Sequence, residues 1–287
     1  MRAEQLTAPV TWHGEGPCWD PAGNRMLVVD MTAGAVVDLS SLTEPTRYSV
    51  GSPVAAVVRP RVGGGFLVAT EHGFSLFDDG FRRERELTQV IDDPALRLNE
   101  GGCDPAGRFF CGSMAYDETP GAASFYRLDT DGTASVLFDG VTISNGLQWS
   151  LDGSRVFYID TPTRRVDVFD YDVEAGTFHN RRPLAELGGL EGSPDGMTID
   201  ADGGLWVAFW GGGAVRRLDP DTGAVTAEVE VPGVTNTSAC AFGGEALDTL
   251  YITSSRQGLD DDAEPQAGAV FAVQPGVRGV PLHAFAG

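Results

Sequence analysis

Short runs of β-branched and aromatic residues recur along the chain, and Gly, Pro, Asp or Asn bounds each of them. They include residues 26–29, 65–69, 156–159, 205–209 and 249–253. Apolar residues at the spacing of an amphipathic helix are scarce throughout. The pattern therefore predicts an all-β chain.

A turn of the form Asp-x-x-Gly, or a close variant, stands directly before six of the strands that we expect. These turns occur in DPAGNRML, RVGGGFLV, DPAGRFFC, LDGSRVFY, DADGGLWV and FGGEALDTLYI, near residues 20, 61, 104, 151, 202 and 242. A repeat of roughly 40 to 50 residues is typical of a four-stranded propeller blade. We predict a six-bladed β-propeller of four-stranded blades, with residues 1–287 as a single domain, and keep a β-sandwich as the alternative fold.

The charge of the chain excludes several classes of function. The formal net charge is −21, so most of the surface should repel nucleic acid and anionic membranes. All 20 basic residues are Arg. Without a Lys amine the chain cannot form a Schiff base with a carbonyl substrate, which excludes aldolase-type chemistry.

The four cysteines, Cys18, Cys103, Cys111 and Cys240, form no CxxC pair. Nothing near them in the sequence supplies the base or helix start that a reactive thiolate needs, so we expect buried free thiols. The N-terminal residues MRAEQLTAPV lack a basic segment followed by an apolar one, and no long apolar run follows. We expect a cytoplasmic protein that is a monomer or a weak homo-oligomer.

Four side chains with an oxygen stand just ahead of the expected innermost strands: Glu15, Asn99, Asn145 and Asp195. Corresponding positions of successive blades are related by rotation about the propeller axis, so these oxygens should meet at one end of the central channel. Carboxylate and amide oxygens suit Ca²⁺, Mg²⁺ or Mn²⁺ and leave coordination positions open. Asn-Gly and Asp-Gly are also common turn pairs, and that reading remains the alternative for each residue taken alone.

Several longer segments resemble the regucalcin/gluconolactonase family of six-bladed propellers. The resemblance runs from GEGP at Gly14 to the C-terminus and is carried by RLNEGGCDPAGRFFCGSMA, VTISNGLQWSLDGSRVFYID and SPDGMTIDADGGLWVAFWGGG. It implies a metal held by Glu15, Asn145 and Asp195, with Arg97 and Asn99 on the substrate or on a metal-bound water. The metal would be Ca²⁺ first, with Zn²⁺, Mg²⁺ and Mn²⁺ as alternatives.

Two positions depart from the pattern of that family. Glu100 follows Asn99 where the family usually has Asp, and Asp117 stands where an acidic substrate contact is usually Glu. Both remain candidate substrate-binding residues, in a pocket that we expect to be shifted or enlarged. His13, two residues before Glu15, is a further candidate at the pocket rim.

The resemblance implies hydrolysis of a small sugar lactone, with Asp195 as the general base. Three alternatives stay open: a propeller that binds Ca²⁺ or another ligand without catalysis, an esterase for a non-sugar lactone, and a serine hydrolase. The last is disfavoured because G-x-S-x-G does not occur and the four histidines lie in no triad segment. LDTDG and LDPDTG are not EF-hand loops, because neither continues to the Glu at loop position twelve.

Overall fold

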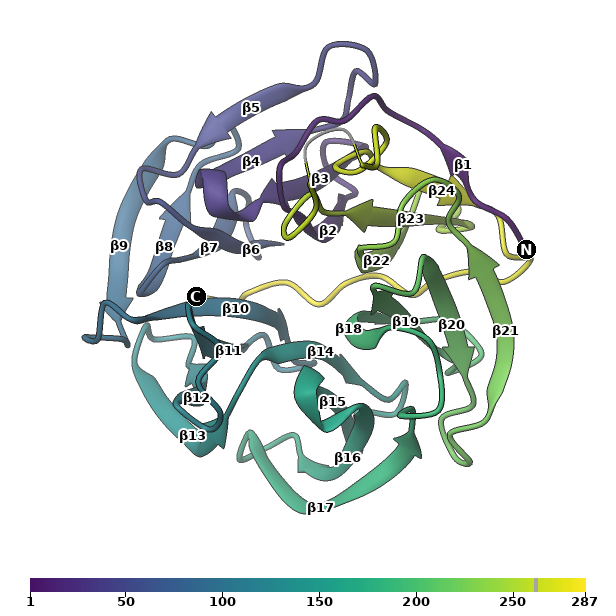
Figure 1. Cartoon of the computed structure of the whole chain (residues 1–287). Coiled ribbons are helices and arrows are strands. Elements are labelled where there is room, and N and C mark those ends of the chain that lie inside the picture. The colour runs from purple at the N-terminus through teal and green to yellow at the C-terminus, as the bar shows by residue number, and fades with distance from the viewer. Residues whose placement is uncertain (261–262) are drawn as a thin grey trace.

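The computed structural model describes residues 1–260 and 263–287. Its strands form six separate four-stranded antiparallel sheets, arranged as blades around a central axis (Figure 1). This confirms the predicted six-bladed propeller. Within the described ranges, helical structure is limited to two single 3₁₀ turns, η1 (Met31–Ala33) and η2 (Thr161–Thr163), and no helix is long and apolar enough to cross a membrane.

Each of the first three blades is one continuous segment of chain, with its strands in sequence order from the axis outward. Blade 1 is β2 (Gly14–Asp20), β3 (Arg25–Asp30), β4 (Ala35–Asp38) and β5 (Thr46–Ser49). Blade 2 is β6 (Ala55–Pro60), β7 (Phe66–Thr70), β8 (Gly73–Phe77) and β9 (Arg83–Gln89). Blade 3 is β10 (Leu96–Cys103), β11 (Phe109–Ala115), β12 (Ala123–Leu128) and β13 (Ala134–Val141).

Blades 4 and 5 repeat this order, whereas blade 6 combines both ends of the chain. Blade 4 is β14 (Ser144–Trp149), β15 (Arg155–Asp160), β16 (Arg165–Asp172) and β17 (Thr177–Glu186). Blade 5 is β18 (Ser193–Ile199), β19 (Leu205–Trp210), β20 (Ala214–Leu218) and β21 (Val225–Glu230). Blade 6 is β22 (Thr237–Gly243), β23 (Thr249–Ser254), β24 (Phe271–Val273) and, outermost, β1 (Glu4–Gln5), so the N-terminal strand closes the ring.

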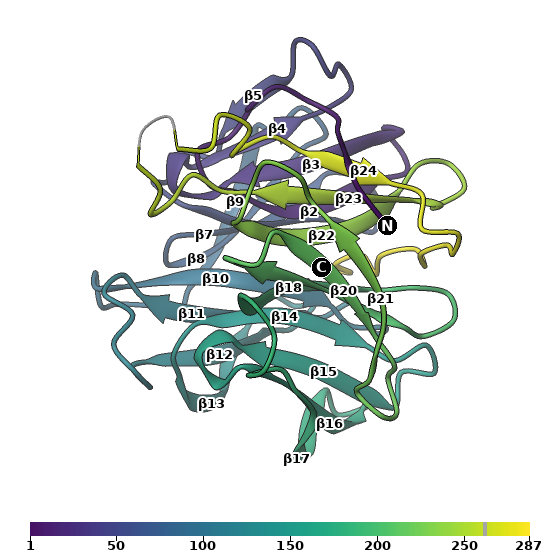
Figure 2. The same ribbon diagram turned by 45° about the vertical axis from the view of Figure 1, so that its right-hand side comes forward.

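Burial falls from the inner to the outer strands of a blade, whose arrangement Figures 1 and 2 show from two directions. In blade 5 the second strand, LWVAFW, is buried at five of its six positions, whereas the outermost strand, VTAEVE, is mostly exposed. The second strand is covered on both faces by the neighbouring blades and therefore carries a nearly continuous apolar run. The four cysteines lie in this buried region as free thiols, as predicted, and burial raises the pKa of Cys18 to about 11.

All six turns that the sequence predicts join an innermost strand to the second strand of the same blade. The ladder between these two strands shifts register once in every blade, near the start of the innermost strand. Such β-bulges leave residues out of the ladder and re-aim their side chains. In four blades the residues beside the shift are the predicted oxygen ligands: Glu15, Asn99, Asn145 and Asp195.

The innermost strands approach one another closely at these bulges. A Cβ atom built on Gly196 would lie 2.5 Å from the Cβ of Ala239 on the next blade, and one on Gly146 would lie 2.8 Å from the carbonyl oxygen of Asp195. The glycines after Asn145 and Asp195 are therefore required by crowding around the axis. Gly16, after Glu15, is required for another reason, because its φ of +48° is unfavourable for other residues.

We predict that Gly196→Ala lowers the free energy of unfolding by about 1–3 kcal/mol, because the added methyl group forces two innermost strands apart. Urea titration followed by circular dichroism measures this change. The matched control is Gly188→Ala, since a Cβ there has no atom within 4 Å. Equal stability of the two variants would show that the strands yield without cost.

Candidate metal and active site

The structure brings the four predicted oxygen ligands to the wall of one cavity at the mouth of the channel. The cavity measures about 290 Å³, and Glu15, Asn99, Asn145 and Asp195 all line it. They come from four different innermost strands, β2, β10, β14 and β18. Rotation from blade to blade is what unites residues that are far apart in the sequence.

An Asp at the end of the second strand fixes the entry to two of these innermost strands. One Oδ1 atom of Asp30 accepts hydrogen bonds from the backbone amides of Trp12 and His13, at 2.9 and 3.0 Å. Asp160 likewise accepts a hydrogen bond from the backbone amide of Ile143, just before Asn145, at 2.8 Å. Each carboxylate thereby holds the chain two residues before a candidate ligand.

A chain of hydrogen bonds sets the orientation of the two amide side chains. Nη1 of Arg97 donates to Oδ1 of Asn99 at 2.6 Å, and Nδ2 of Asn99 donates to Oδ1 of Asn145 at 2.8 Å. Nδ2 of Asn145 in turn donates to the hydroxyl of Thr161 at 2.8 Å. The carbonyl oxygen of Asn145 accepts one of these bonds and keeps a second lone pair for a cation.

Glu15 and Asp195 are both buried, and no ion pair in the described part of the chain joins either one to an Arg or His. Burial, together with repulsion from Glu100, raises the pKa of Glu15 to about 8. Burial and the charges of Glu15 and Glu100 raise the pKa of Asp195 well above its usual range. Arg97 opposes both shifts, but its own bonds go to neutral groups.

This pair of buried carboxylates fits a divalent cation. Two like charges in a dry site need a counter-charge, and a dication provides one that both can share. In the described ranges no three His, Cys, Asp or Glu side chains gather closely enough to hold a metal by themselves. The third protein oxygen would have to be that of Asn145, which makes an all-oxygen set suited to hard cations.

Glu100 lies behind the cavity rather than on its wall. Its side chain is 7% exposed, and Oε2 is buried without a hydrogen-bond partner. Burial raises the pKa of Glu100 to about 7, against the attraction of Arg59. Its charge raises the pKa values of Glu15 and Asp195. Glu100 therefore influences the site without facing the space that a substrate would fill.

The structure does not bring Asp117 to this cavity. The carboxylate of Asp117 is exposed and accepts hydrogen bonds from the amide and the hydroxyl of Thr119, at 3.0 and 2.7 Å. The next residue, Glu118, lines the cavity instead. Glu118 has a φ of +58°, so the chain turns sharply there, and this turn decides which of two adjacent acids faces inward.

Arg97 is held by neutral partners and keeps donors for a ligand. It is 4% exposed, and its three protein hydrogen bonds, to Met31, Leu98 and Asn99, all use Nη1. Within the described residues Nη2 and Nε have no protein partner. The guanidinium lies 5.8 Å from the ring centroid of Tyr116, which covers it from the rim.

His13 also lines the cavity, and its ring is held in place. Nδ1 lies 2.8 Å from the hydroxyl of Ser255, and the ring meets Trp210 edge to face at 5.7 Å. Burial and the charge of Arg97 lower the pKa of His13 to about 3, so the ring is neutral. Sequence reasoning missed Thr161 and Trp210. Trp210 is the last residue of the second strand β19, and Thr161 directly follows the second strand β15. The segments VVDM, YIDT and AFWG occupy corresponding places in their blades and could have pointed to both residues.

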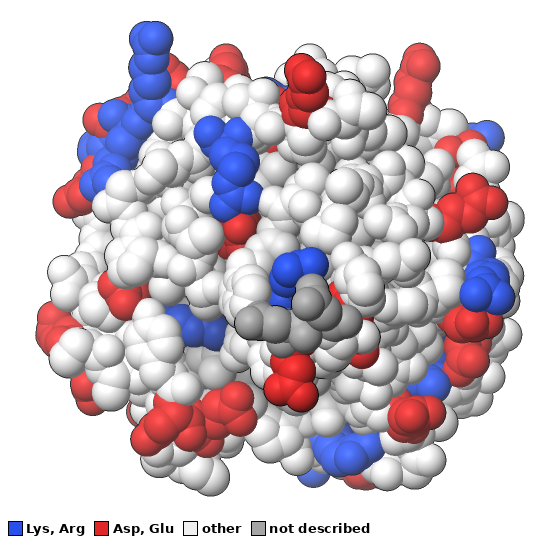
Figure 3. Space-filling model, turned by 45° about the horizontal axis from the view of Figure 1, so that its top comes forward, with Lys and Arg blue, Asp and Glu red and all other residues white. Residues whose placement is uncertain are grey.

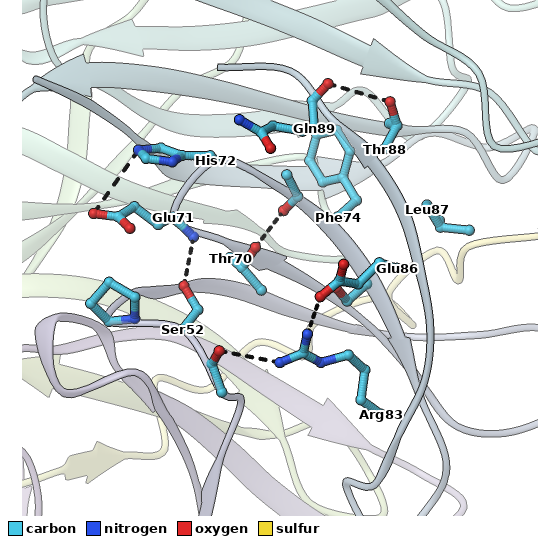
Figure 4. A pocket seen from close by; sticks show the side chains of 14 residues that line it. Ser52, Thr70, Glu71, His72, Phe74, Arg83, Glu86, Leu87, Thr88 and Gln89 are labelled. Atoms are coloured by element: carbon cyan, nitrogen blue, oxygen red, sulfur yellow. Dashed lines mark hydrogen bonds and ion pairs between the residues drawn. The ribbon is translucent and has the colours of Figure 1, made fainter. Parts of the chain in front are cut away.

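A second hollow, of about 390 Å³, opens on the outer part of blade 2 (Figure 4). Its charged groups already have partners within the protein: Arg83 bonds Glu86 and a backbone carbonyl, and Glu71 accepts the hydroxyl of Tyr116 at 2.6 Å. These contacts leave few groups free for a ligand. The cavity at the channel mouth is therefore the candidate active site.

The surface in Figure 3 agrees with the excess of acidic residues in the chain. On the face shown, Arg side chains are separated by Asp, Glu and uncharged residues. Such a distribution does not offer the clustered positive charge that phosphate backbones require.

Comparison with known proteins gives one consistent result. The family model described as the SMP-30/Gluconolactonase/LRE-like region matches residues 13–256. Regucalcin from Danio rerio is 40% identical over 280 residues, which cover 96% of this chain and 95% of that protein.

Two solved structures share the whole architecture. A luciferin-regenerating enzyme has a TM-score of 0.90 and 31% identity, with 99% of each chain covered. Regucalcin from Agrobacterium tumefaciens, described as a calcium-binding protein, has a TM-score of 0.92 and 29% identity, with 99% of this chain and 97% of the other covered.

We predict that Glu15→Gln changes stability in two ways. In metal-free protein the raised pKa of Glu15 means that the folded state binds a proton more tightly than the unfolded state, so stability falls as pH rises from about 4.5 to 8. The stability of the variant should fall less over this pH range. Added Ca²⁺ should also raise its Tm less than that of the wild type, by a difference of at least about 3 °C.

Differential scanning fluorimetry at pH 6 and pH 8.5, with a chelator and then with Ca²⁺, measures both effects. The same rise in Tm with Ca²⁺ in both proteins would remove Glu15 from the cation site.

Proposed function

The chain belongs to the SMP-30/gluconolactonase/LRE-like family, and we propose that it hydrolyses a small lactone with one divalent cation at the mouth of its channel. The observation that carries the proposal is the pair of buried carboxylates, Glu15 and Asp195, without an ion-pair partner among the described residues, beside an Arg97 that keeps free donors. This combination provides a place for a cation, a proton acceptor and a hold on substrate oxygens in one cavity.

Glu15, Asn145 and Asp195 would hold the cation. Bound there, it would polarise the lactone carbonyl and stabilise the charge that develops on the carbonyl oxygen. Asp195 would take a proton from the water that attacks the carbonyl carbon, and that proton then passes to the ring oxygen as the C–O bond breaks. Burial and the charges of Glu15 and Glu100 raise its pKa in the metal-free protein, which makes the carboxylate a stronger proton acceptor.

Asn99 would act mainly through Asn145. Both hydrogens of its Nδ2 are used, on the carbonyl of Ser144 at 2.7 Å and on Asn145 at 2.8 Å. It therefore fixes the amide ligand rather than facing the reacting atoms, unless substrate replaces one of these bonds. Arg97 would bind substrate oxygens with Nη2 and Nε.

Glu118 would supply the acidic substrate contact that the family resemblance suggested for Asp117. It lines the cavity together with the apolar groups Trp210 and Met114. A carboxylate there can accept hydrogen bonds from substrate hydroxyls, while the apolar wall covers the carbon skeleton. Sugar lactones satisfy both sides, so we keep a sugar lactone as the proposed substrate class.

Ca²⁺ is the first choice of cation, because the set is made of oxygens only and a relative is described as a calcium-binding protein. Zn²⁺, Mg²⁺ and Mn²⁺ remain alternatives. A propeller that binds Ca²⁺ without catalysis is the competing function, and the first experiment below separates the two. The cytoplasmic location and the monomeric or weakly oligomeric state stay predictions.

The test of the proposal is acid release from glucono-δ-lactone in a pH-stat. We expect hydrolysis above the spontaneous rate, its loss after exhaustive chelation, and its return with a divalent cation, because the carbonyl depends on the charge of that cation. Full activity in metal-free protein would overturn the metal dependence. A rise in Tm with Ca²⁺ but no hydrolysis across a panel of lactones would favour the non-catalytic function.

Asp195→Asn separates the two roles of Asp195. The amide keeps an oxygen of similar shape but cannot take a proton from water. At saturating metal we expect kcat to fall by about 10²-fold or more. Metal content is measured alongside by atomic absorption, since one ligand charge is also lost. A fully loaded variant with near-normal kcat would transfer the base role to another group.

Glu118→Gln and Asp117→Asn test which acid meets the substrate. We expect the first to raise KM about tenfold, because a charge-assisted hydrogen bond is lost, and the second to leave KM unchanged. Initial rates over a range of lactone concentrations give both values. The reverse result would restore Asp117 as the substrate contact.

A further inference from the structure

The end of the channel opposite the candidate active site contains a second cavity, of about 350 Å³. The last residues of β10, β14 and β18 surround it, and the C-terminal segment lies across it, with residues 280–283 on its wall. Figure 1 shows this yellow segment passing across the centre of the ring toward β10. The cavity is thus formed from innermost strands on one side and from the C-terminus on the other.

Backbone hydrogen bonds fix the C-terminal segment at both sides of the ring. The amide of Ala201 in blade 5 donates to the carbonyl of Arg278 at 2.7 Å, and the amide of Phe285 donates to the carbonyl of Pro60 in blade 2 at 2.9 Å. The wall that residues 280–283 contribute is therefore held in place. A ligand of this cavity would meet a preformed site.

Arg59 is the charged group of this cavity, and its charge is not neutralised by contact. It is 8% exposed, donates to the carbonyl oxygens of Val58 at 2.8 Å and Gly101 at 2.7 Å, and also contacts the thiol of Cys18. No carboxylate of the described residues forms an ion pair with it. Glu100 acts on it from the channel side, but beyond the 4.0 Å of an ion pair.

The turn of blade 2 lacks the buried acid that the turns of two other blades carry. The turns of blades 3 and 5 begin with Asp104 and Asp200, which are fully buried and paired with Arg108 at 2.8 Å and Arg217 at 2.6 Å. In blade 2 the corresponding position is Arg61. Its backbone amide donates to the carbonyl of the residue four positions later, and the amides of Asp104 and Asp200 do the same. Blade 2 therefore brings an Arg to the channel and has another Arg, in place of a buried acid, at its turn.

The remaining wall combines a few donors with apolar surface. The hydroxyl of Thr198 and the ring of His283 line the cavity without a protein hydrogen bond among the described residues, and Trp149, Ile199 and Leu282 provide apolar contact. One guanidinium suits the planar oxygens of a carboxylate, whereas a phosphate dianion would need more donors than this wall offers. The ligand should therefore carry one carboxylate on an apolar body.

We propose that this cavity binds a small organic monocarboxylate, with the carboxylate on Arg59 and the carbon chain against Trp149 and Leu282. The site is separate from the lactone site, because it lies at the other end of the channel and shares no lining residue with it. A failure of the proposed lactonase activity would leave this inference untouched.

Isothermal titration calorimetry of the Ca²⁺-loaded protein with hexanoate tests the proposal. We expect saturable binding of hexanoate and none of the neutral isostere hexanamide at the same concentrations. Arg59→Gln should weaken hexanoate binding by about tenfold or more, since a buried charged hydrogen-bond donor is lost. Equal affinity in the wild type and in Arg59→Gln, or no saturable binding to the wild type, would overturn the proposal.

Two controls locate the bound carboxylate. Arg97→Ala removes the free guanidinium at the other end of the channel, and Arg85→Gln removes an exposed Arg of blade 2, so both should keep the affinity for hexanoate. Loss of binding in Arg97→Ala would place the ligand at the channel mouth and refute the second site. If Arg59→Gln does not fold, Leu282→Asp serves instead, because a carboxylate on the C-terminal segment should abolish binding by repulsion.

Discussion

The innermost strands of the six blades meet around one axis with so little room between them that no side chain fits at Gly146 or Gly196. Each innermost strand has a β-bulge near its start. In four blades the residues beside the bulge are oxygen side chains that line one cavity: Glu15, Asn99, Asn145 and Asp195. The close approach that completes the ring also assembles the site.

The same crowding removes water from the two carboxylates of the site. Burial raises the pKa values of Glu15 and Asp195, and the charge of Glu100 raises both further. Neither carboxylate forms an ion pair with an Arg or His among the described residues. A protein without ligand gains nothing from such an arrangement, since buried like charges cost stability. The arrangement becomes favourable when a cation is shared between them. The amides of Asn99 and Asn145 are already held in place by hydrogen bonds that join blades 3 and 4.

The two ends of the channel differ in how charge is treated. At the end that the C-terminal segment crosses, the buried turn acids Asp104 and Asp200 each form an ion pair with an Arg, so they stabilise the fold. Blade 2 departs from this rule by placing Arg59 at the channel and Arg61 at the turn. Among the described residues, the mouth of the channel holds two buried acids and Arg97 without an ion pair, and the other end holds Arg59 without one. Each end therefore keeps charge that a ligand could balance.

The sequence by itself determined the number of blades, because six turn-and-strand repeats each specify one hairpin through local rules. It also identified Glu15, Asn145 and Asp195 as candidate ligands, because corresponding positions of a repeat share one place in a propeller. Only the tertiary structure decided between Asp117 and Glu118, because a single residue with positive φ sets which of two neighbours faces inward. The tertiary structure also added Thr161 and Trp210 to the cavity wall, and it alone brought the C-terminal segment to the cavity of Arg59. The C-terminal segment belongs to no repeat, so no spacing along the chain encodes its contact with Arg59.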